Sequence, residues 1–398
     1  RRSLFLSLSL SLSVFFLTTF LPLKSLHLSL SLTRLCVCPS SLSLVSKSLS
    51  LSVSSVFITF TPSLSPSNPS LSVRTAVDMD TLVEHTLDFL ARNIDCFVGE
   101  EADSSLLGVP AHQLEQILAC SVQKYKFYNV PMLYSMVNAC TEVVDLWVED
   151  EESYCCITDE VLRHILECDC HPSILKLPFL PNTSTAAVGE MLQHLRSGLQ
   201  VLWLRGPNSA TMGTAQALFQ QGESLPVQEL RLIAPHTDFP FSWLTWGTPH
   251  LSSLHIRSAQ GLTDDGVEAI VSHCHHLVEL HLERCPGVSD SSAVIVCSKM
   301  RSLRKLGFPE CQKISSLTLD TLAENSDLTS SLEELDLSDL PSVAEGSFFD
   351  VFNKTTNLRK VTLERNKFNM RDWIVSTLAS TCNTKLEWLS LAGCHSVS

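Results

Sequence analysis

The chain has 398 residues, a length that allows two or three domains, and 44% of its residues are hydrophobic, enough for a sizeable core. Its formal net charge of −14 argues against a nucleic acid or a membrane surface as a partner held by bulk charge. The fifteen cysteines include no Cys-x-x-Cys pair, which favours buried thiols and a reducing compartment, the cytoplasm or the nucleus.

Residues 1–78 alternate serine with leucine and are of low complexity, as in the stretch LSLSLSLSV near the start. The first methionine of the chain is Met79, so we interpret this tract as translated upstream sequence and expect the protein to begin at that residue. A signal peptide over the first 23 residues is the alternative, although the serines make the tract polar for such a segment. We assign no fold to this tract.

The composition changes at Met79, and residues 79–140 show the spacing of three short helices. Prolines at positions 110 and 131 suit the first turns of the second and third helices. We expect this segment to cover the open end of the repeats that follow it. The predicted inward residues are Leu82, Val83, Leu87, Leu90 and Ile94, then Leu114, Ile117, Leu118 and Val122, then Met132, Leu133, Met136, Val137 and Cys140.

From residue 141 onward the chain repeats the pattern Leu-x-x-Leu-x-Leu, at intervals from 24 (251 − 227) to 29 residues (172 − 143). One strand and one helix cannot bury their own apolar faces, so such units stack into a solenoid with a continuous core. The predicted fold class is therefore α/β, a solenoid of parallel strands with one helix per repeat over 141–398. The copies start at Val143, Pro172, Leu199, Val227, Leu251, Leu277, Leu303, Leu332, Leu358 and Leu386.

The spacers between the predicted strands carry helix signals. In the fifth copy, Thr263 or Asp264 is expected to accept the free amide hydrogens at the start of a helix. Val267, Ile270 and Val271 then fall on one face of that helix, which we expect to point inward.

The repeats resemble the cysteine-containing class of leucine-rich repeat, in which a cysteine closes the turn after each strand. The resemblance implies a scaffold that binds other proteins. The chain stops at Ser398 directly after a strand and a turn, so we expect the array to continue beyond that residue. The turn position holds Cys285, Cys311 and Cys394 in three copies, and Pro207, Ala259, Leu340 and Asn366 in four others.

Residues that alternate with the buried leucines are expected to lie on the concave strand face, where a solenoid binds its partner. Two tryptophans are predicted to face solvent there as binding anchors. Glu279, Glu283, Glu334 and Asp336 should make the middle of the face acidic and suited to a segment with lysine, arginine or a free amino terminus. The candidate partner-binding residues are Trp203, Arg231, His255, Glu279, His281, Glu283, Asp336 and Trp388.

Residues 81–94 (TLVEHTLDFLARNI) resemble the first helix of the Zyg/Zer family of cullin-RING ubiquitin ligase substrate receptors, which docks into Elongin C. Residues 106–118 (LLGVPAHQLEQIL) resemble both that family's next helix and the start of an F-box, which would imply a Skp-type adaptor and a different cullin. Thr86 stands where the family has cysteine, and no proline precedes Leu82. The implied adaptor-binding residues are Leu82, Thr86, Leu87, Leu90, Pro110 and Leu114.

This resemblance implies a substrate-recognition subunit that binds Elongin B/C and a cullin, or a Skp-type adaptor and a cullin, together with a protein substrate. A scaffold or regulator without a ligase, and a secreted recognition protein, are the alternatives. The sequence has no phosphate-binding glycine loop, no H-E-x-x-H and no G-x-S-x-G, so we predict a non-catalytic protein without a cofactor. Cysteines and histidines cluster over 155–171 and 273–276, but no standard ligand spacing occurs and no metal site is predicted.

Overall fold

The computed structural model describes residues 88, 91, 110–125, 133, 136–137, 139–147, 157–219, 224–367, 370–382 and 384–397. Apart from Asp88, all of these belong to one compact unit, Leu90–Ser398. The interpretation of the tract 1–78 and the predicted adaptor-binding residues Leu82, Thr86, Leu87 and Leu90 lie outside the described residues. Among the helices of the described part, none has the length and apolar character needed to span a membrane.

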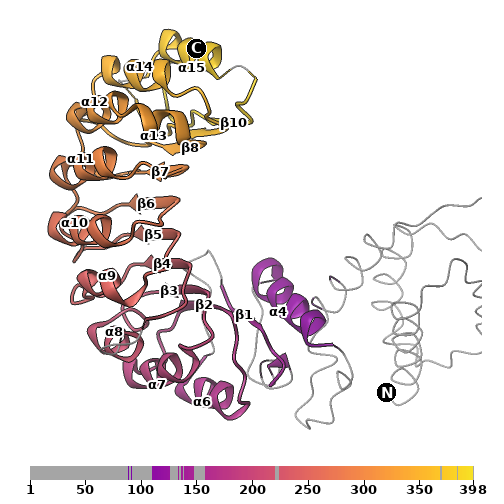
Figure 1. Cartoon of the computed structure of the whole chain (residues 1–398). Helices are drawn as coiled ribbons and strands as arrows, with labels where there is room; N and C mark the ends of the chain where they lie inside the picture. The colour runs from indigo at the N-terminus through magenta and orange to yellow at the C-terminus, as the bar shows by residue number, and fades with distance from the viewer. Residues whose placement is uncertain are drawn as a thin grey trace, which may run out of the picture. The chain divides into compact units, whose positions relative to one another are not determined.

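A ten-stranded parallel sheet runs through this unit, with its strands in chain order, so each strand pairs with those of the neighbouring repeats. Each of the ten predicted copies contains one strand, which confirms the predicted solenoid (Figure 1). The strands are β1 (Val143–Asp145), β2 (Ile174–Phe179), β3 (Val201–Arg205), β4 (Glu229–Ile233), β5 (Ser253–Arg257), β6 (Glu279–Glu283), β7 (Lys305–Gly307), β8 (Glu334–Asp336), β9 (Lys360–Thr362) and β10 (Trp388–Ser390).

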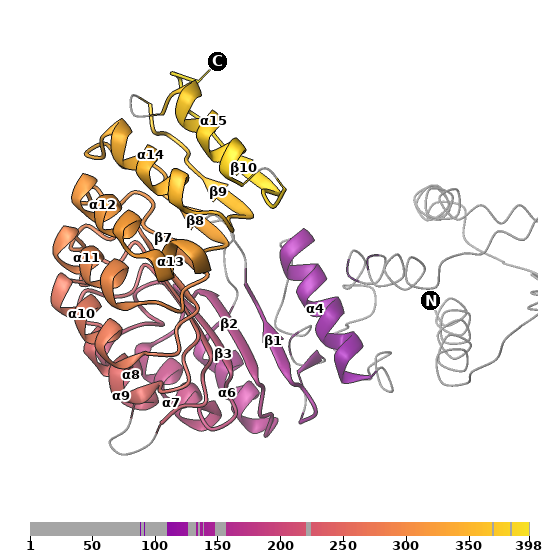
Figure 2. The same ribbon diagram turned by 45° about the horizontal axis from the view of Figure 1, so that its top comes forward.

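The helices of the repeats form the outer, convex layer, and the strands line the inner, concave side (Figures 1 and 2). The core lies between the two layers, where strand leucines meet helix residues such as Val267, Ile270 and Val271, each buried as predicted. These helices are α6 (Asp159–Glu167), α7 (Thr185–Leu195), α8 (Met212–Leu218), the 3-10 turn η2 (Phe241–Trp243), α9 (Leu244–Gly247), α10 (Asp264–His273), α11 (Asp290–Lys299), α12 (Ser316–Glu324), α13 (Ser326–Ser331), α14 (Glu345–Lys354) and α15 (Asp372–Thr381).

The turn after each strand joins one repeat to the one before it. The thiols of Cys285, Cys311 and Cys394 are buried, and each donates to a carbonyl in or just after the strand of the preceding repeat at 2.9 to 3.7 Å. Asn366 fills the same position and donates its side-chain amide to the carbonyl of Leu337 at 2.8 Å. A hydrogen-bond donor at this position thus gives a carbonyl of the preceding repeat a partner.

The cysteines of the described part are free thiols, and seven of them are buried. Burial raises the pKa of Cys274 to about 11, so this thiol stays protonated and unreactive near neutral pH. Cys297 is completely buried, and its pKa rises to about 12 for the same reason. The prediction of buried thiols is therefore confirmed for these helix cysteines, which pack as small apolar residues.

A second set of inter-repeat bonds begins at the first residue of each of three helices, α6, α10 and α11. Asp264 accepts hydrogen bonds from the amide of Ser289 at 2.8 Å, from its hydroxyl at 2.6 Å, and from the hydroxyl of Ser292 at 2.5 Å. Asp290 binds Ser315 of the following repeat in the same way. The predicted helix cap was wrong: Thr263 makes no side-chain cap bond. Asp264 instead satisfies the start of the next helix, because that start lies alongside its own.

Helix α4 (Ala111–Tyr125) lies beside β1 at the first edge of the sheet (Figure 1). Its residue Glu115 accepts the amide hydrogens of Glu142 and Val143 through Oε1, at 2.6 and 3.1 Å. These amides sit at an edge where, among the described strands, β1 pairs with β2 alone. The helix thus satisfies edge groups that would otherwise be left to solvent, as expected of a cap.

The predicted inward residues before the array are mostly confirmed where they are described. Four of α4 are at most 3% exposed, and Leu133, Met136 and Val137 are also buried. Cys140 was predicted to point inward but is exposed, because it lies in the turn that leads to β1. The four buried residues of α4 are Leu114, Ile117, Leu118 and Val122.

A candidate binding surface on the concave face

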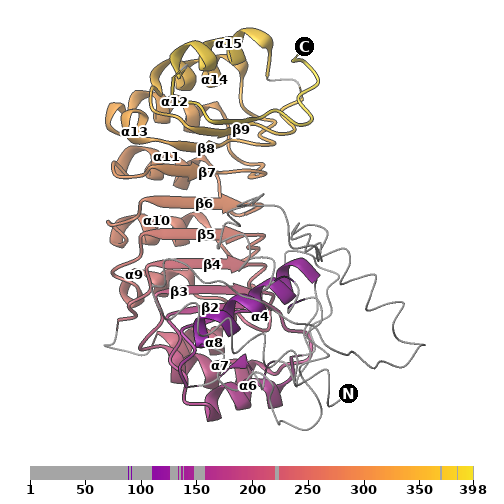
Figure 3. The same cartoon turned by 90° about the vertical axis from the view of Figure 1, so that its right-hand side faces the viewer.

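The strands lie side by side (Figure 3), and their register places the outward residues in three rows that cross the sheet. Because the strands are parallel and in register, equivalent residues of successive repeats are immediate neighbours. The first row includes Glu229, Ser253, Glu279, Lys305, Glu334, Lys360 and Trp388. The central row is Asp145, Lys176, Trp203, Arg231, His255, His281, Gly307, Asp336, Thr362 and Ser390. The third row includes Arg205, Ile233, Arg257 and Glu283.

Trp203 is the centre of a cluster at the amino-terminal end of this face. The Nζ atom of Lys176 lies 4.2 Å from the centroid of its ring, and the guanidinium carbon of Arg231 lies 3.9 Å from it. Trp147 packs edge-on at 5.2 Å between ring centroids, and the indole N–H donates to Glu229 at 2.7 Å. Trp203 was predicted to face solvent but is half-buried, because the neighbouring repeats cover both faces of its ring.

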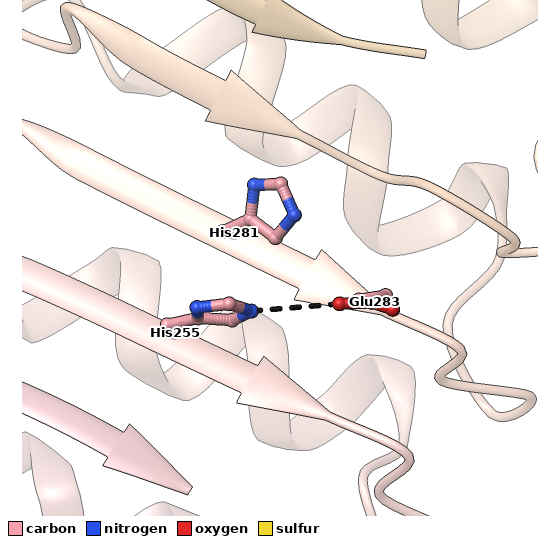
Figure 4. A group of neighbouring side chains, drawn as sticks. All are labelled: His255, His281 and Glu283. Carbon is pink, nitrogen blue, oxygen red and sulfur yellow. Dashed lines mark ion pairs between the residues drawn. The ribbon is translucent and has the colours of Figure 1, made fainter. Parts of the chain in front are cut away.

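The middle of the face brings together His255, His281 and Glu283 (Figure 4). The two imidazole rings meet edge-on with centroids 4.6 Å apart. His255 Nε2 lies 3.7 Å from a Glu283 oxygen, too far for a hydrogen bond. This nitrogen is buried and has no hydrogen-bond partner among the described residues.

Burial, with a smaller contribution from His255, lowers the pKa of His281 to about 3, so its imidazole is neutral near neutral pH. Burial opposes ionisation of Glu283, but His255 and Arg257 outweigh it and lower the pKa of this carboxyl. Its other oxygen is held by the Nε of Arg257 at 3.1 Å. The cluster therefore combines two imidazole rings with one ionised carboxylate.

The acidic residues of the face are largely paired with basic ones. Lys305 Nζ lies between Glu279 and Glu334, at 3.7 and 3.2 Å from their oxygens. Asp336 accepts hydrogen bonds from the amide and hydroxyl of Ser338 at 3.1 and 2.7 Å, and burial raises its pKa. Cross-strand cations that are distant in sequence lie beside Glu279, Glu283 and Glu334, so the charge of the predicted acidic centre is partly neutralised. A cavity of about 170 Å³ opens among these side chains.

Trp388 lies at the other end of the face and is 59% exposed, as predicted for a binding anchor. It belongs to β10, which pairs with β9 alone among the described strands. The leucines of this last repeat, Leu386, Leu389 and Leu391, are half-buried, whereas those of the inner repeats are buried. The difference follows from having one neighbouring repeat in place of two.

Of the residues predicted to bind an adaptor, Pro110 and Leu114 are described. Pro110 is half-buried and directly precedes α4, where its carbonyl accepts from the amides of Gln113 and Leu114. Leu114 is 3% exposed and belongs to the apolar face of the helix, so it cannot form part of an adaptor-binding surface in this structure. Its helical spacing from Ile117 and Leu118 predicted an inward side chain, and the structure has that orientation.

Sequence analysis missed the cluster of His255, His281 and Glu283 as a unit. The signal was their recurrence: histidine is the third strand residue in both SLHIR and ELHLE, two consecutive repeats. It also missed Lys176 in the row, since the second repeat begins with a proline and was the weakest match. Of the cysteines in the cluster 155–171, Cys168 lies 3.3 Å from His164 and Cys170 is buried in the core.

Comparisons with known proteins agree with this fold. A family model described as Leucine Rich repeat matches residues 248–271. No curated protein matches the chain in a sequence comparison. A chain from the crystal structure of the Rad7 and Elc1 complex in yeast matches with a TM-score of 0.51 and 15% identity, covering 91% of this chain and 95% of that one. Together with the ten strands in one ordered parallel sheet, these likenesses support a fold like that of a leucine-rich-repeat solenoid.

Proposed function

We propose that the protein is the substrate-recognition subunit of a cullin-RING ubiquitin ligase and binds protein substrates on its concave face. The observation that carries the proposal is the order of parts: a segment resembling adaptor-binding helices directly precedes a repeat array whose strand face is lined with charged and aromatic side chains. The fold is like that of a chain crystallised in a complex of two proteins, Rad7 and Elc1. Free buried thiols suit a protein of the cytoplasm or nucleus.

The proposed adaptor is Elongin B/C. A Skp-type adaptor is the alternative, which the resemblance to an F-box supports. The contact residues are Leu82, Thr86, Leu87 and Leu90, with Pro110 shaping the start of the next helix. Leu114 is omitted because its side chain is buried. The substrate contacts Trp388 and the polar rows between Trp203 and Asp336.

Co-purification of the full chain with Elongin B/C, and separately with a Skp-type adaptor, tests the proposal. We expect one adaptor to be recovered and Leu82→Asp to abolish its recovery. Trp388→Ala is the matched control, because this exposed residue at the far end of the array should leave adaptor binding unchanged. Recovery of neither adaptor by a folded chain would refute the ligase assignment.

A non-ligase scaffold is the second candidate, and the packing of α4 favours it. The buried Leu114 and the bonds from Glu115 to the edge of β1 account for this helix as a cap without any adaptor. In that case Leu82→Asp should alter only the thermal stability of the chain, whereas Trp388→Ala should weaken binding of the partner protein. The two candidates therefore differ in how the first variant behaves in the adaptor co-purification.

A further inference from the structure

We propose that His255, His281 and Glu283 form a binding site for a divalent transition-metal ion of the zinc class on the concave face. One ligand atom from each of these three side chains lies within 4.8 Å of the other two (Figure 4). Two imidazole nitrogens and one carboxylate oxygen form a donor set typical of zinc sites that leave a fourth position open. All three residues belong to the repeats, so the site does not depend on the proposed ligase role.

The spacing of the donors is close to what the ion requires. Zinc lies about 2.0–2.1 Å from nitrogen ligands, so tetrahedral ligand atoms are about 3.4 Å apart. His255 Nε2 and the nearer Glu283 oxygen are already 3.7 Å apart. Because all three ligand atoms lie within 4.8 Å of one another, side-chain rotations that close the remaining gaps would bring them to coordination distance while β5 and β6 stay in place.

The nitrogen of His255 is the strongest sign that this cluster can bind a ligand. It is buried, and within the described part of the chain it has no hydrogen-bond partner. Leaving a buried polar atom without a partner costs roughly 1–3 kcal/mol. A metal ion bound between the histidine and Glu283 would satisfy this atom, and neither residue would need a proton to do so.

The surrounding residues hold two of the ligands in place. Arg257 binds one oxygen of Glu283 at 3.1 Å and leaves the other facing His255, the kind of outer contact that orients metal ligands. Gly307, the next residue of the central row, provides the space that His281 occupies, because a Cβ atom at this position would overlap its ring. The residue beside His281 in the central row is therefore one without a side chain.

A carboxylate beside His281 and a cavity give a cation charge and access here, against the positive charge of Arg231, Lys305 and Lys360, which line the same cavity. Asp336 supplies a second carboxylate, 3.9 Å from His281 Nε2. The guanidinium of the nearby Arg231 stacks on Trp203 on the side of β3. His255, His281 and Asp336 all line the cavity of about 170 Å³, so an ion bound there could accept a water molecule or a partner's side chain as its fourth ligand.

Titration of the full chain with Co²⁺, followed by competition with Zn²⁺, tests the site. We expect one Co²⁺ to bind with the visible absorption of a tetrahedral nitrogen and oxygen site, without the sulfur charge-transfer band that thiolate ligands produce. The double variant His255→Asn/His281→Asn should weaken binding by about a hundredfold or more. The matched control, His275→Asn/His276→Asn, removes two exposed histidines beyond α10 and should leave binding unchanged.

Gly307→Ala tests the site without changing a ligand, because the added methyl group displaces His281. We expect about a tenfold to hundredfold loss of Co²⁺ affinity. Gly346→Ala is the control, since a Cβ atom there meets nothing within 4 Å. Circular dichroism checks that each variant is folded. If a variant does not fold, Glu283→Gln is tested in its place. Failure to bind Co²⁺, binding with a thiolate spectrum, or equal affinity in the ligand variants would overturn the proposal.

Discussion

The bonds made by Asp264 predict very different costs for two neighbouring substitutions in α10. Asp264 accepts three hydrogen bonds from Ser289 and Ser292 at 2.5 to 2.8 Å, whereas Asp265 is exposed. Hydrogen bonds to a charged group contribute roughly 1.5–3 kcal/mol, which we reduce to about 1 kcal/mol each for partial exposure. Asp264→Asn keeps the side-chain shape but turns an amide group towards these donors. The remaining amide oxygen can still accept two of the three bonds, so we expect Asp264→Asn to lower the free energy of unfolding by about 1–2 kcal/mol.

Asp265→Asn makes the same change of charge in the same helical turn and should cost less than about 0.5 kcal/mol. Burial opposes ionisation of Asp264, but its hydrogen bonds outweigh burial and lower its pKa. Such a carboxyl stabilises the fold above its unfolded pKa, about 3.9, and this stability is lost as the pH falls through its folded pKa. The difference between wild type and Asp264→Asn should therefore be steady near neutral pH and shrink below about pH 4.

Urea unfolding followed by circular dichroism, together with hydrogen exchange at the Ser289 amide, measures these effects. The exchange experiment reports on the junction between α10 and α11 directly, because this amide donates to Asp264. Equal losses in the two variants, or a penalty for Asp264→Asn that is the same at acidic and neutral pH, would refute the reasoning.

Three further predictions concern the stability of single repeats. Asn366→Ala should cost about 2–3 kcal/mol in urea unfolding, because it leaves the buried carbonyl of Leu337 without its donor, and Asn366→Cys should cost less. Phe308→Ala removes a ring that is 1% exposed and should cost about 3–5 kcal/mol in the same assay. Gly206→Ala should lower the melting temperature, since Gly206 has a φ of 87° and an added Cβ would overlap Phe179.

The repeat period and the spacing of leucines were sufficient to predict the solenoid. A strand that buries three leucines on one side needs a neighbour of the same kind, so the order and direction of the strands followed from the repetition alone. The turn position could also be located, although the reason for its cysteines could not. That reason is a carbonyl of the preceding repeat, which lies 29 residues from Cys311 in the chain and 3.2 Å from its sulfur.

Only the tertiary structure decided how the outward side chains meet. Trp203 was expected to be free, yet Trp147 and Arg231, from neighbouring parts of the array, cover it. Thr263 or Asp264 was expected to cap the helix that begins there, yet Asp264 accepts its hydrogen bonds from Ser289 and Ser292 of the next repeat. The physical reason is the same in each case. Local pattern determines which face of a strand or helix a residue occupies, whereas its partners come from repeats about 26 positions away, brought alongside by register.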